Sequence, residues 1–115
     1  MLRQVVDGLA ARPEVAGVAV VSGDGLVIEQ ALHVAADRDA IAALATTLTR
    51  HGRELGAAAR LGNLGAAVLE YTAGPAIIRP LHDGASLVVL GRPDADLGEL
   101  LYLLRRHHGA LADLL

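Results

Sequence analysis

The sequence has no cysteine, tryptophan, phenylalanine or lysine, and its only aromatic residues are Tyr71 and Tyr102. The absence of cysteine excludes disulfide bonds, thiolate metal sites and thiol nucleophiles. Because aromatic side chains are so scarce, the core must be aliphatic. Uninterrupted apolar runs fall well short of the roughly 20 residues that cross a bilayer, and the first residues lack the pattern of a signal peptide. We therefore expect a cytoplasmic protein without membrane insertion.

What is present is a chain of 115 residues, of which 53% are hydrophobic and 20% are charged. This length and composition predict one globular domain spanning residues 1–115. The formal net charge of −3 disfavours nucleic acid as a partner. So much apolar residue in so small a volume also indicates that some of it is buried between subunits, which is a first indication of an oligomer.

Hydrophobic periodicity predicts the order helix, two strands, long helix, three strands, helix. We expect helices near 2–12, 37–60 and 97–115, and strands near 15–21, 26–32, 65–72, 76–81 and 85–91. Val18 to Val21 are all apolar, so both faces of the sheet should be covered. The prediction is an α/β (α+β) fold, with three α/β/α layers around a mixed or antiparallel five-stranded sheet.

The long helix should begin at Asp37 or Asp39 and end at Gly62-Asn63. At about 36 Å it would be longer than a five-stranded sheet is wide, which is roughly 20–25 Å. One apolar stripe on it comprises Ile41, Leu44, Ala45, Leu48, Leu55 and Ala59, and small residues follow elsewhere at Ala36, Ala40, Ala43, Thr47, Gly52 and Gly56. The small residues are either a solvated, alanine-rich face or a place where a second backbone approaches. The overhang and the glycine pair favour the second interpretation, as helix-on-helix dimerisation.

Three motifs could carry chemistry, and each has a simpler explanation. Ser22-Gly23-Asp24-Gly25 resembles a phosphate-binding loop, but it leads into a strand and no lysine accompanies it, so we predict a hairpin tip. The histidines His33, His51, His82, His107 and His108 lack the spacing of metal ligands. The hydroxyl residues Ser22, Ser86, Thr46, Thr47 and Thr49 lack an oriented base. We predict no catalytic residue, metal or cofactor, and no enzyme.

Arginines gather on the last two predicted helices. Arg50, Arg53 and Arg60 are either an ordinary solvated face or a polar rim that recognises a partner protein. Asp96 and Glu99 resemble a capping box at the start of the last helix. Near the end of that helix, Arg105 and Arg106 are expected to complement its dipole.

The element order, the hairpin VAGVAVVSGDGLVIEQ, the long alanine-rich helix and the segments NLGAAVLEY and ASLVVLG resemble the Roadblock / dynein light chain family over essentially the whole chain. Profilin-like and longin-like domains share this architecture. The resemblance implies a homodimer in which the long helices pack together and the third strands pair edge to edge. That arrangement would place at or near the interface Ala43, Thr47, Gly52, Gly56, Ala66, Val68 and Glu70.

The resemblance also implies a function, because bacterial members of the family include a co-regulator of a gliding-motility GTPase. The expected role is a non-catalytic regulator or scaffold that binds a Ras-like small GTPase and modulates its nucleotide cycle. Two alternatives stay open. One is a protein-assembly module without a GTPase partner, and the other is a small-ligand sensor or enzyme that uses a cleft between the layers.

Overall fold

The computed structural model describes residues 1–32 and 35–113, so His33 and the last two residues of the predicted helix 97–115 lie outside the described residues. Its elements are α1 (Leu2–Ala10), β1 (Val15–Val21), β2 (Val27–Leu32), α2 (Arg38–Ala58), β3 (Ala67–Tyr71), β4 (Gly74–Pro80), β5 (Ser86–Gly91) and α3 (Leu97–Asp113). The five strands form one sheet in the order β2-β1-β5-β4-β3. Every neighbouring pair is antiparallel, which confirms the predicted α+β fold and decides between a mixed and an antiparallel sheet.

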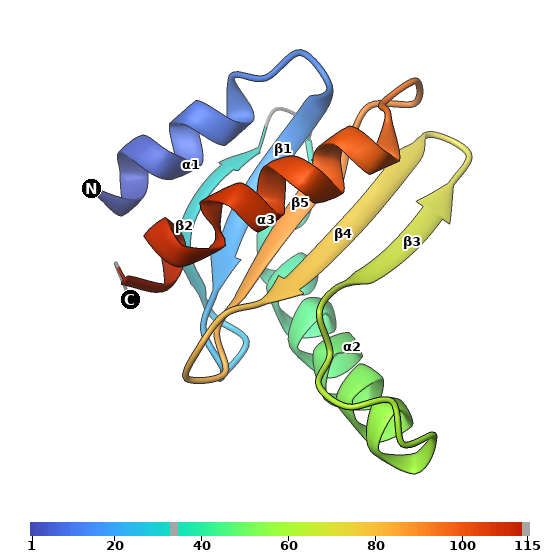
Figure 1. The fold of residues 1–115 in the computed structure, drawn as a ribbon. Coiled ribbons are helices and arrows are strands. Elements are labelled where there is room, and N and C mark those ends of the chain that lie inside the picture. The colour runs from blue at the N-terminus through green and yellow to red at the C-terminus, as the bar shows by residue number, and fades with distance from the viewer. Residues whose placement is uncertain (33–34, 114–115) are drawn as a thin grey trace.

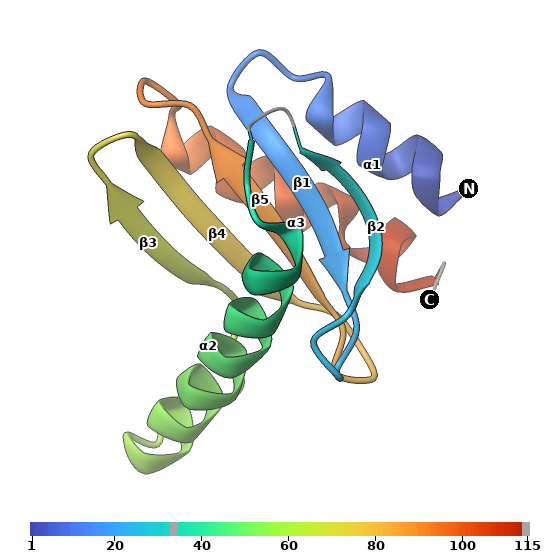
Figure 2. The same cartoon turned by 180° about the vertical axis from the view of Figure 1, so that it is seen from behind.

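The sheet is the middle of three layers. Helices α1 and α3 lie on one of its faces, and α2 lies on the other (Figures 1 and 2). Strand β1 is buried from Val18 to Val21 because both of its faces are covered, as its unbroken apolar run predicts. The two edges of the sheet are formed by β2 and β3, which are the elements that a second chain could reach.

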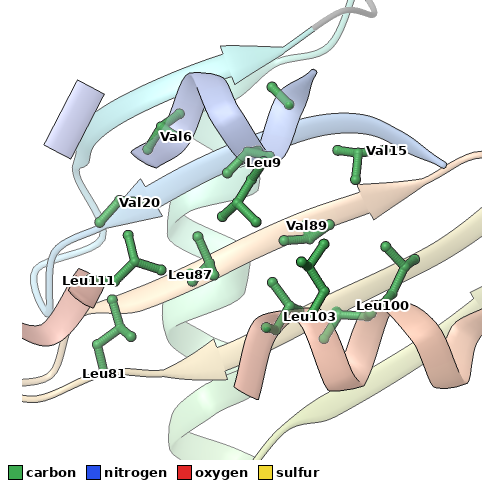
Figure 3. Packing of buried hydrophobic residues seen from close by; sticks show 14 of the residues in the cluster. Val6, Leu9, Val15, Val20, Leu81, Leu87, Val89, Leu100, Leu103 and Leu111 are labelled. Atoms are coloured by element: carbon green, nitrogen blue, oxygen red, sulfur yellow. The ribbon is translucent and has the colours of Figure 1, made fainter. Parts of the chain in front are cut away.

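The face under α1 and α3 holds the larger core, and it is built from long aliphatic side chains (Figure 3). Its fully buried members include Val6 and Leu9 from α1, Val20, Ile77, Leu87 and Val89 from the sheet, and Leu100, Leu104 and Leu111 from α3. These side chains supply the aliphatic core that the scarcity of aromatic residues requires.

The face under α2 is packed through much smaller side chains. The helix contributes Ala42 and Ala45 to a buried cluster, and the sheet contributes residues such as Ala19 and Val88. One turn further along, Thr49 is also buried, where its hydroxyl donates to the carbonyl of Ala45 at 2.8 Å. Small residues on this side allow α2 to lie close to the strands.

The apolar stripe expected on the long helix is therefore divided. Ala45 is buried against the sheet, whereas Leu44 and Leu55 are 61% and 68% exposed and Leu48 is 37% exposed. Ala59, placed in the same stripe, lies just beyond the helix end and is exposed. The leucines project to the side of the helix because alanines occupy its contact with the sheet.

The loop after α2 packs against two glycines of this helix, through a side chain at Gly52 and through its backbone at Gly56. A Cβ atom added to Gly52 would lie 3.0 Å from Cδ2 of Leu64, and one added to Gly56 would lie 3.1 Å from the carbonyl oxygen of Gly62. The returning loop between α2 and β3 thus occupies the glycine pair. The close approach predicted from these glycines exists within the subunit, and their place at a dimer interface stays a prediction.

Both ends of α2 have defined caps. Asp37 accepts a hydrogen bond from the backbone N–H of Ala40 at 3.1 Å, which selects Asp37 of the two predicted caps. At the other end Arg60 has a φ of +57°, and the N–H of Leu61 donates to the carbonyl of Gly56 at 2.8 Å. This is a Schellman motif with arginine in the position that usually holds glycine.

The predicted overhang of α2 is present. Its 21 residues correspond to about 32 Å, and its C-terminal half extends beyond the sheet (Figures 1 and 2).

Helix α3 begins as predicted, because the N–H of Glu99 donates to Asp96 Oδ1 at 3.1 Å. The prediction for Arg105 and Arg106 was wrong, since α3 continues to Asp113 and the last turn of its described part carries no basic residue.

Candidate functional site

The Ser22–Gly25 loop is a hairpin tip. The N–H of Ser22 donates to the carbonyl of Leu26 at 2.8 Å, and the N–H of Gly25 donates back to the carbonyl of Ser22 at 3.0 Å. Gly25 adopts a φ of +81°, a conformation that glycine provides without steric cost. The loop connects β1 to β2 and no helix starts from it, so its backbone lacks the helix N-terminus that a phosphate site uses.

The candidate chemical residues are dispersed. Within residues 1–32 and 35–113, no three His, Asp or Glu side chains are grouped so that they could hold a metal ion. His51 pairs with Glu54 at 3.3 Å, and Nδ1 of His107 lies 2.9 Å from the carbonyl of Leu103. The buried hydroxyl of Ser86 lies 3.4 Å from that of Thr49, under α2. Each of these groups has a local structural partner.

An apolar groove of about 400 Å³ runs between α2 and the β3 side of the sheet. Side chains of Ile41, Leu44, Ala45, Thr47 and Leu48 line it from α2, and side chains of Leu69, Tyr71, Ala76, Ile78, Val88 and Leu90 line it from the sheet. Large apolar side chains on its rim are turned to water, with Tyr71 63% exposed and Leu44 61% exposed. Exposed apolar surface gathered in this way is typical of a protein–protein contact.

The outer edge of β3 lies beside this groove. Glu70 stands opposite Pro75 in the ladder with β4, and Pro75 has no N–H to donate. The Glu70–Pro75 pair is therefore a non-hydrogen-bonded one, and so is the Val68–Ile77 pair two residues away, because the two kinds alternate in an antiparallel ladder. The N–H and C=O groups of Val68 and Glu70 consequently point away from the sheet and are available to another strand.

The opposite edge, β2, is closed by side chains of the same chain. The N–H of Gln30 donates to Glu29 Oε1 at 3.3 Å, and the N–H of Leu32 donates to Gln30 Oε1 at 3.0 Å. The guanidinium of Arg3, from α1, donates to the carbonyl of Gln30 at 2.6 Å. Side-chain capping of this kind protects an edge strand from pairing, so the sheet has one closed edge and one open edge.

The structure places the predicted interface residues in three places. Val68 and Glu70 lie at the open edge, with Ala66 just before β3 and packed against the larger core, and Ala43 and Thr47 lie on the part of α2 that reaches the groove or the hairpin tip. Gly52 and Gly56 lie on another face of α2, against the returning loop.

Sequence reasoning missed the leucines of α2 and Tyr71 as interface candidates. The leucines form one stripe in the sequence. Only the packing shows that alanines of α2, and not these leucines, contact the sheet. Of the predicted partner-binding residues, Arg50 and Arg53 are exposed on the overhang of α2, and Arg60 is exposed at its cap.

These features define a small antiparallel α+β domain with an open, apolar interaction surface. A profile of the Roadblock/LC7 domain matches residues 1–91, which include every element up to the end of β5. The chain therefore belongs to the Roadblock/LC7 family, as its resemblance implied. Within the described residues, no helix has the length and apolar character needed to cross a membrane.

Solved structures share the fold. The Roadblock/LC7 domain from Streptomyces avermitilis is 26% identical, with a TM-score of 0.81, over 96% of this chain and 91% of that chain. MglB from Myxococcus xanthus is 18% identical, with a TM-score of 0.88, over 98% and 93% of the two chains. LokiProfilin1 is 19% identical, with a TM-score of 0.60, over 97% and 95%, which confirms the profilin-like architecture. Among curated proteins, no sequence matches the chain.

Proposed function

We propose that this chain forms a homodimer and acts as a non-catalytic regulator or scaffold that binds a Ras-like small GTPase and modulates its nucleotide cycle. The observation that carries the proposal is the apolar groove lying directly beside the open edge of β3. A second copy offers both features that these surfaces lack: an apolar helix face for the groove, and a strand for the edge.

The side chains of β3 favour one register for the paired strands. In a two-fold antiparallel pair centred on Leu69, Val68 of each copy would stand opposite Glu70 of the other. Pairing Glu70 with itself would bring two like charges opposite one another, which is destabilising. The favoured register joins the outward N–H and C=O groups of Val68 and Glu70 and produces one continuous sheet across both subunits.

The same contact would cover the leucines of α2. Leu44 and Leu48 project from the side of the helix toward the groove, so a neighbouring copy of α2 can pack against them. Full burial of one leucine side chain contributes about 1.5–3 kcal/mol, and a symmetric contact counts each leucine twice. Apolar burial and strand pairing would therefore act together in one interface.

The GTPase part of the proposal is supported by family membership and by the surface that a dimer would leave free. Exposed Arg50 and Arg53 lie on the overhang of α2, outside the core of the subunit. A partner bound there would have its switch loops biased toward one nucleotide state. Any effect on hydrolysis would come from ordering groups of the GTPase that position water.

Sedimentation velocity at several protein concentrations tests the dimer. We expect the mass of two chains, and we expect Leu44→Asp to raise the dimer dissociation constant by about tenfold or more, since a charge would enter an apolar contact. Leu26→Asp is the matched control, because Leu26 is 65% exposed, close to the 61% of Leu44, but lies at the β1–β2 hairpin, near the edge of the sheet opposite β3. Equal effects of the two variants would contradict the proposed interface.

A pull-down with a candidate Ras-like GTPase tests the partner. The GTPase is loaded with GDP or with a non-hydrolysable GTP analogue, and we expect binding that depends on the nucleotide and weakens with Arg50→Glu. Negligible binding in both states, by a chain that still dimerises, would remove the GTPase and leave the assembly-module alternative.

A further inference from the structure

A cluster of positive charge lies on the face of the sheet opposite the apolar groove. Arg79, on β4, is half-buried beneath α3, where its Nε donates to Nδ1 of His108 at 3.4 Å and its Nη1 donates to the carbonyl of Gly65 at 3.4 Å. Arg105 lies one turn before His108 on α3, close enough to Arg79 for the two charges to repel. Burial and the charge of Arg105 both lower the pKa of the Arg79 guanidinium.

The cluster adjoins a hollow of about 560 Å³ at the end of β4. His108 lines it from α3, Arg53 lines it from α2, and Asn63 and Leu64 line it from the loop between α2 and β3. Its other walls include Pro80, Leu81 and His82. The volume falls within the range of about 300–1,000 Å³ that is usual for ligand sites.

Carboxylates near this cluster do not neutralise it. In the described part of the chain, neither Arg79 nor Arg105 forms an ion pair with an acidic side chain. Two acidic residues adjoin the lining in sequence. Glu54 is paired with Nδ1 of His51 at 3.3 Å, and Asp83 is 89% exposed and is paired with Nδ1 of His82 at 2.9 Å. Arg79 is half-buried whereas Arg105 is exposed, so an anion that joins the two guanidinium groups would offset the partial loss of water around Arg79.

We propose that a carboxylate-rich segment of a partner protein binds in this hollow and is held by His108, which lines it, and by Arg79 and Arg105, which lie beside it on β4 and α3. The guanidinium groups would donate charge-assisted hydrogen bonds to its carboxylates. The apolar walls at Pro80, Leu81 and Leu64 suit the aliphatic parts of a peptide. No residue that lines this hollow also lines the apolar groove, so the two sites can be occupied independently.

A peptide fits this site better than a nucleic acid does. The chain carries a net charge of −3, so a long polyanion would meet repulsion outside the cluster. The hollow's lining contains no tyrosine, tryptophan or phenylalanine on which a base could stack, and its only aromatic rings are the imidazoles of His82 and His108. A short acidic segment would contact the local positive charge and avoid the rest of the surface.

The test is an NMR titration of the ¹⁵N-labelled full chain with acetylated hexaglutamate and, separately, with hexaglutamine. We expect saturable shifts at the amides of Arg79, Arg105 and His108 with hexaglutamate, and affinity for hexaglutamine that is weaker by about tenfold or more. Raising the salt concentration should weaken hexaglutamate binding, since the contact is electrostatic. No saturable shift at these amides, or equal affinity for the two peptides, would overturn the proposal.

Variants locate the site. Arg105→Gln changes an exposed side chain and is expected to weaken hexaglutamate binding several-fold with the fold intact. Arg79→Gln should weaken binding in the same way, and a dispersed amide spectrum of this variant would show that it is folded. Arg38→Gln removes an equal charge at the start of α2 and should change nothing. Unchanged affinity in Arg105→Gln would contradict the site. A single-stranded hexathymidylate that shifts the same amides at lower concentration than hexaglutamate would replace the peptide with a nucleic acid.

Discussion

The face of the sheet under α1 and α3 is covered by leucines and valines, whereas the face under α2 is covered by alanines and a threonine and stays open toward β3. On the first face, large side chains point inward and the helices close the core. On the second, small side chains let α2 approach the strands, and Leu44 and Leu48 point sideways into the apolar groove. Leucine side chains therefore fill the core on the first face and line an exposed groove on the second.

The two edges of the sheet repeat this difference. Strand β2 is capped by Arg3, Glu29 and Gln30 from its own chain, while the outward groups of β3 at Val68 and Glu70 point away from β4. The open edge borders the open face. One side of the molecule is thus complete in a single chain, and the other side has the properties of a surface that is covered by a partner.

The largest expected effect is on the free energy of unfolding, and it distinguishes the face under α1 and α3 from the open face under α2. Leu104, on α3, is 1% exposed, so Leu104→Ala should lower the free energy of unfolding by about 2–5 kcal/mol. Leu44→Ala, on the open face, should change the unfolding free energy of the monomer by no more than about 0.5 kcal/mol. Urea unfolding at protein concentrations too low for association measures both, and similar losses would show that the faces do not differ.

The next effect concerns the open edge. Val68→Pro removes an N–H that points outward, so it should raise the dimer dissociation constant by about tenfold, while the subunit remains folded because edge positions tolerate proline. Leu69→Pro is the matched control, since the N–H of Leu69 belongs to the ladder with Ala76 and its loss should unfold the subunit. Sedimentation and circular dichroism distinguish the two outcomes. A Val68→Pro chain that still dimerises with unchanged affinity would exclude pairing through β3.

The fold could be predicted from the sequence because its signals are local. The run from Val18 to Val21, the Gly23-Asp24-Gly25 turn and the cap at Asp37 each specify an element without reference to the rest of the chain. The periodicity also gave the length of α2 to within a few residues. The order of strands in the sheet was not predicted, because pairing between distant segments leaves no local signal.

The candidate site could be predicted only in part. Val68 and Glu70 were placed at an interface through the family resemblance, and the structure shows that they lie at the open edge. Gly56 carried the right physical signal, close approach of a backbone, whereas Gly52 makes room for the side chain of Leu64. A glycine does not reveal whether the group that approaches it belongs to its own chain. The sideways direction of Leu44 depends on Ala42 and Ala45 taking the contact with the sheet, which is a property of packing.

A smaller effect is expected at the end of α2, where the open side of the molecule extends beyond the sheet. Arg60 has a φ of +57°, so Arg60→Gly should raise the free energy of unfolding by about 0.5–1 kcal/mol. Ala57→Gly, inside the helix, introduces the same residue and should lower stability by a similar amount. Thermal unfolding provides both values. If Arg60 also contacts a partner, Arg60→Gly will weaken partner binding although it stabilises the chain. Opposite changes in binding and stability would separate the role of Arg60 in recognition from its role in the helix cap.

The smallest expected effect is on the pH dependence of stability, and it concerns the closed edge, β2. Arg3 donates to Glu29 Oε1 at 2.7 Å, and this hydrogen bond is the main reason that the pKa of Glu29 is lowered. A lowered carboxyl pKa contributes stability above its unfolded value of about 4.3, and this contribution is lost as the pH falls through the folded value. Thermal unfolding of the native chain should therefore lose more stability between about pH 5 and pH 3 than that of Glu29→Gln.

Glu54→Gln, on the overhang of α2, is the control that leaves the β2 cap unchanged. Because Glu29 also accepts from the N–H of Gln30, the Gln30 amide should exchange with solvent more slowly than the outward amide of Val68 in the monomer, and Glu29→Gln should reduce that difference. Equal exchange of the Gln30 and Val68 amides in the native monomer would mean that the side chains do not close β2. The two edges would then be equally open to a second chain, and the choice of β3 as the pairing edge would depend on the apolar groove alone.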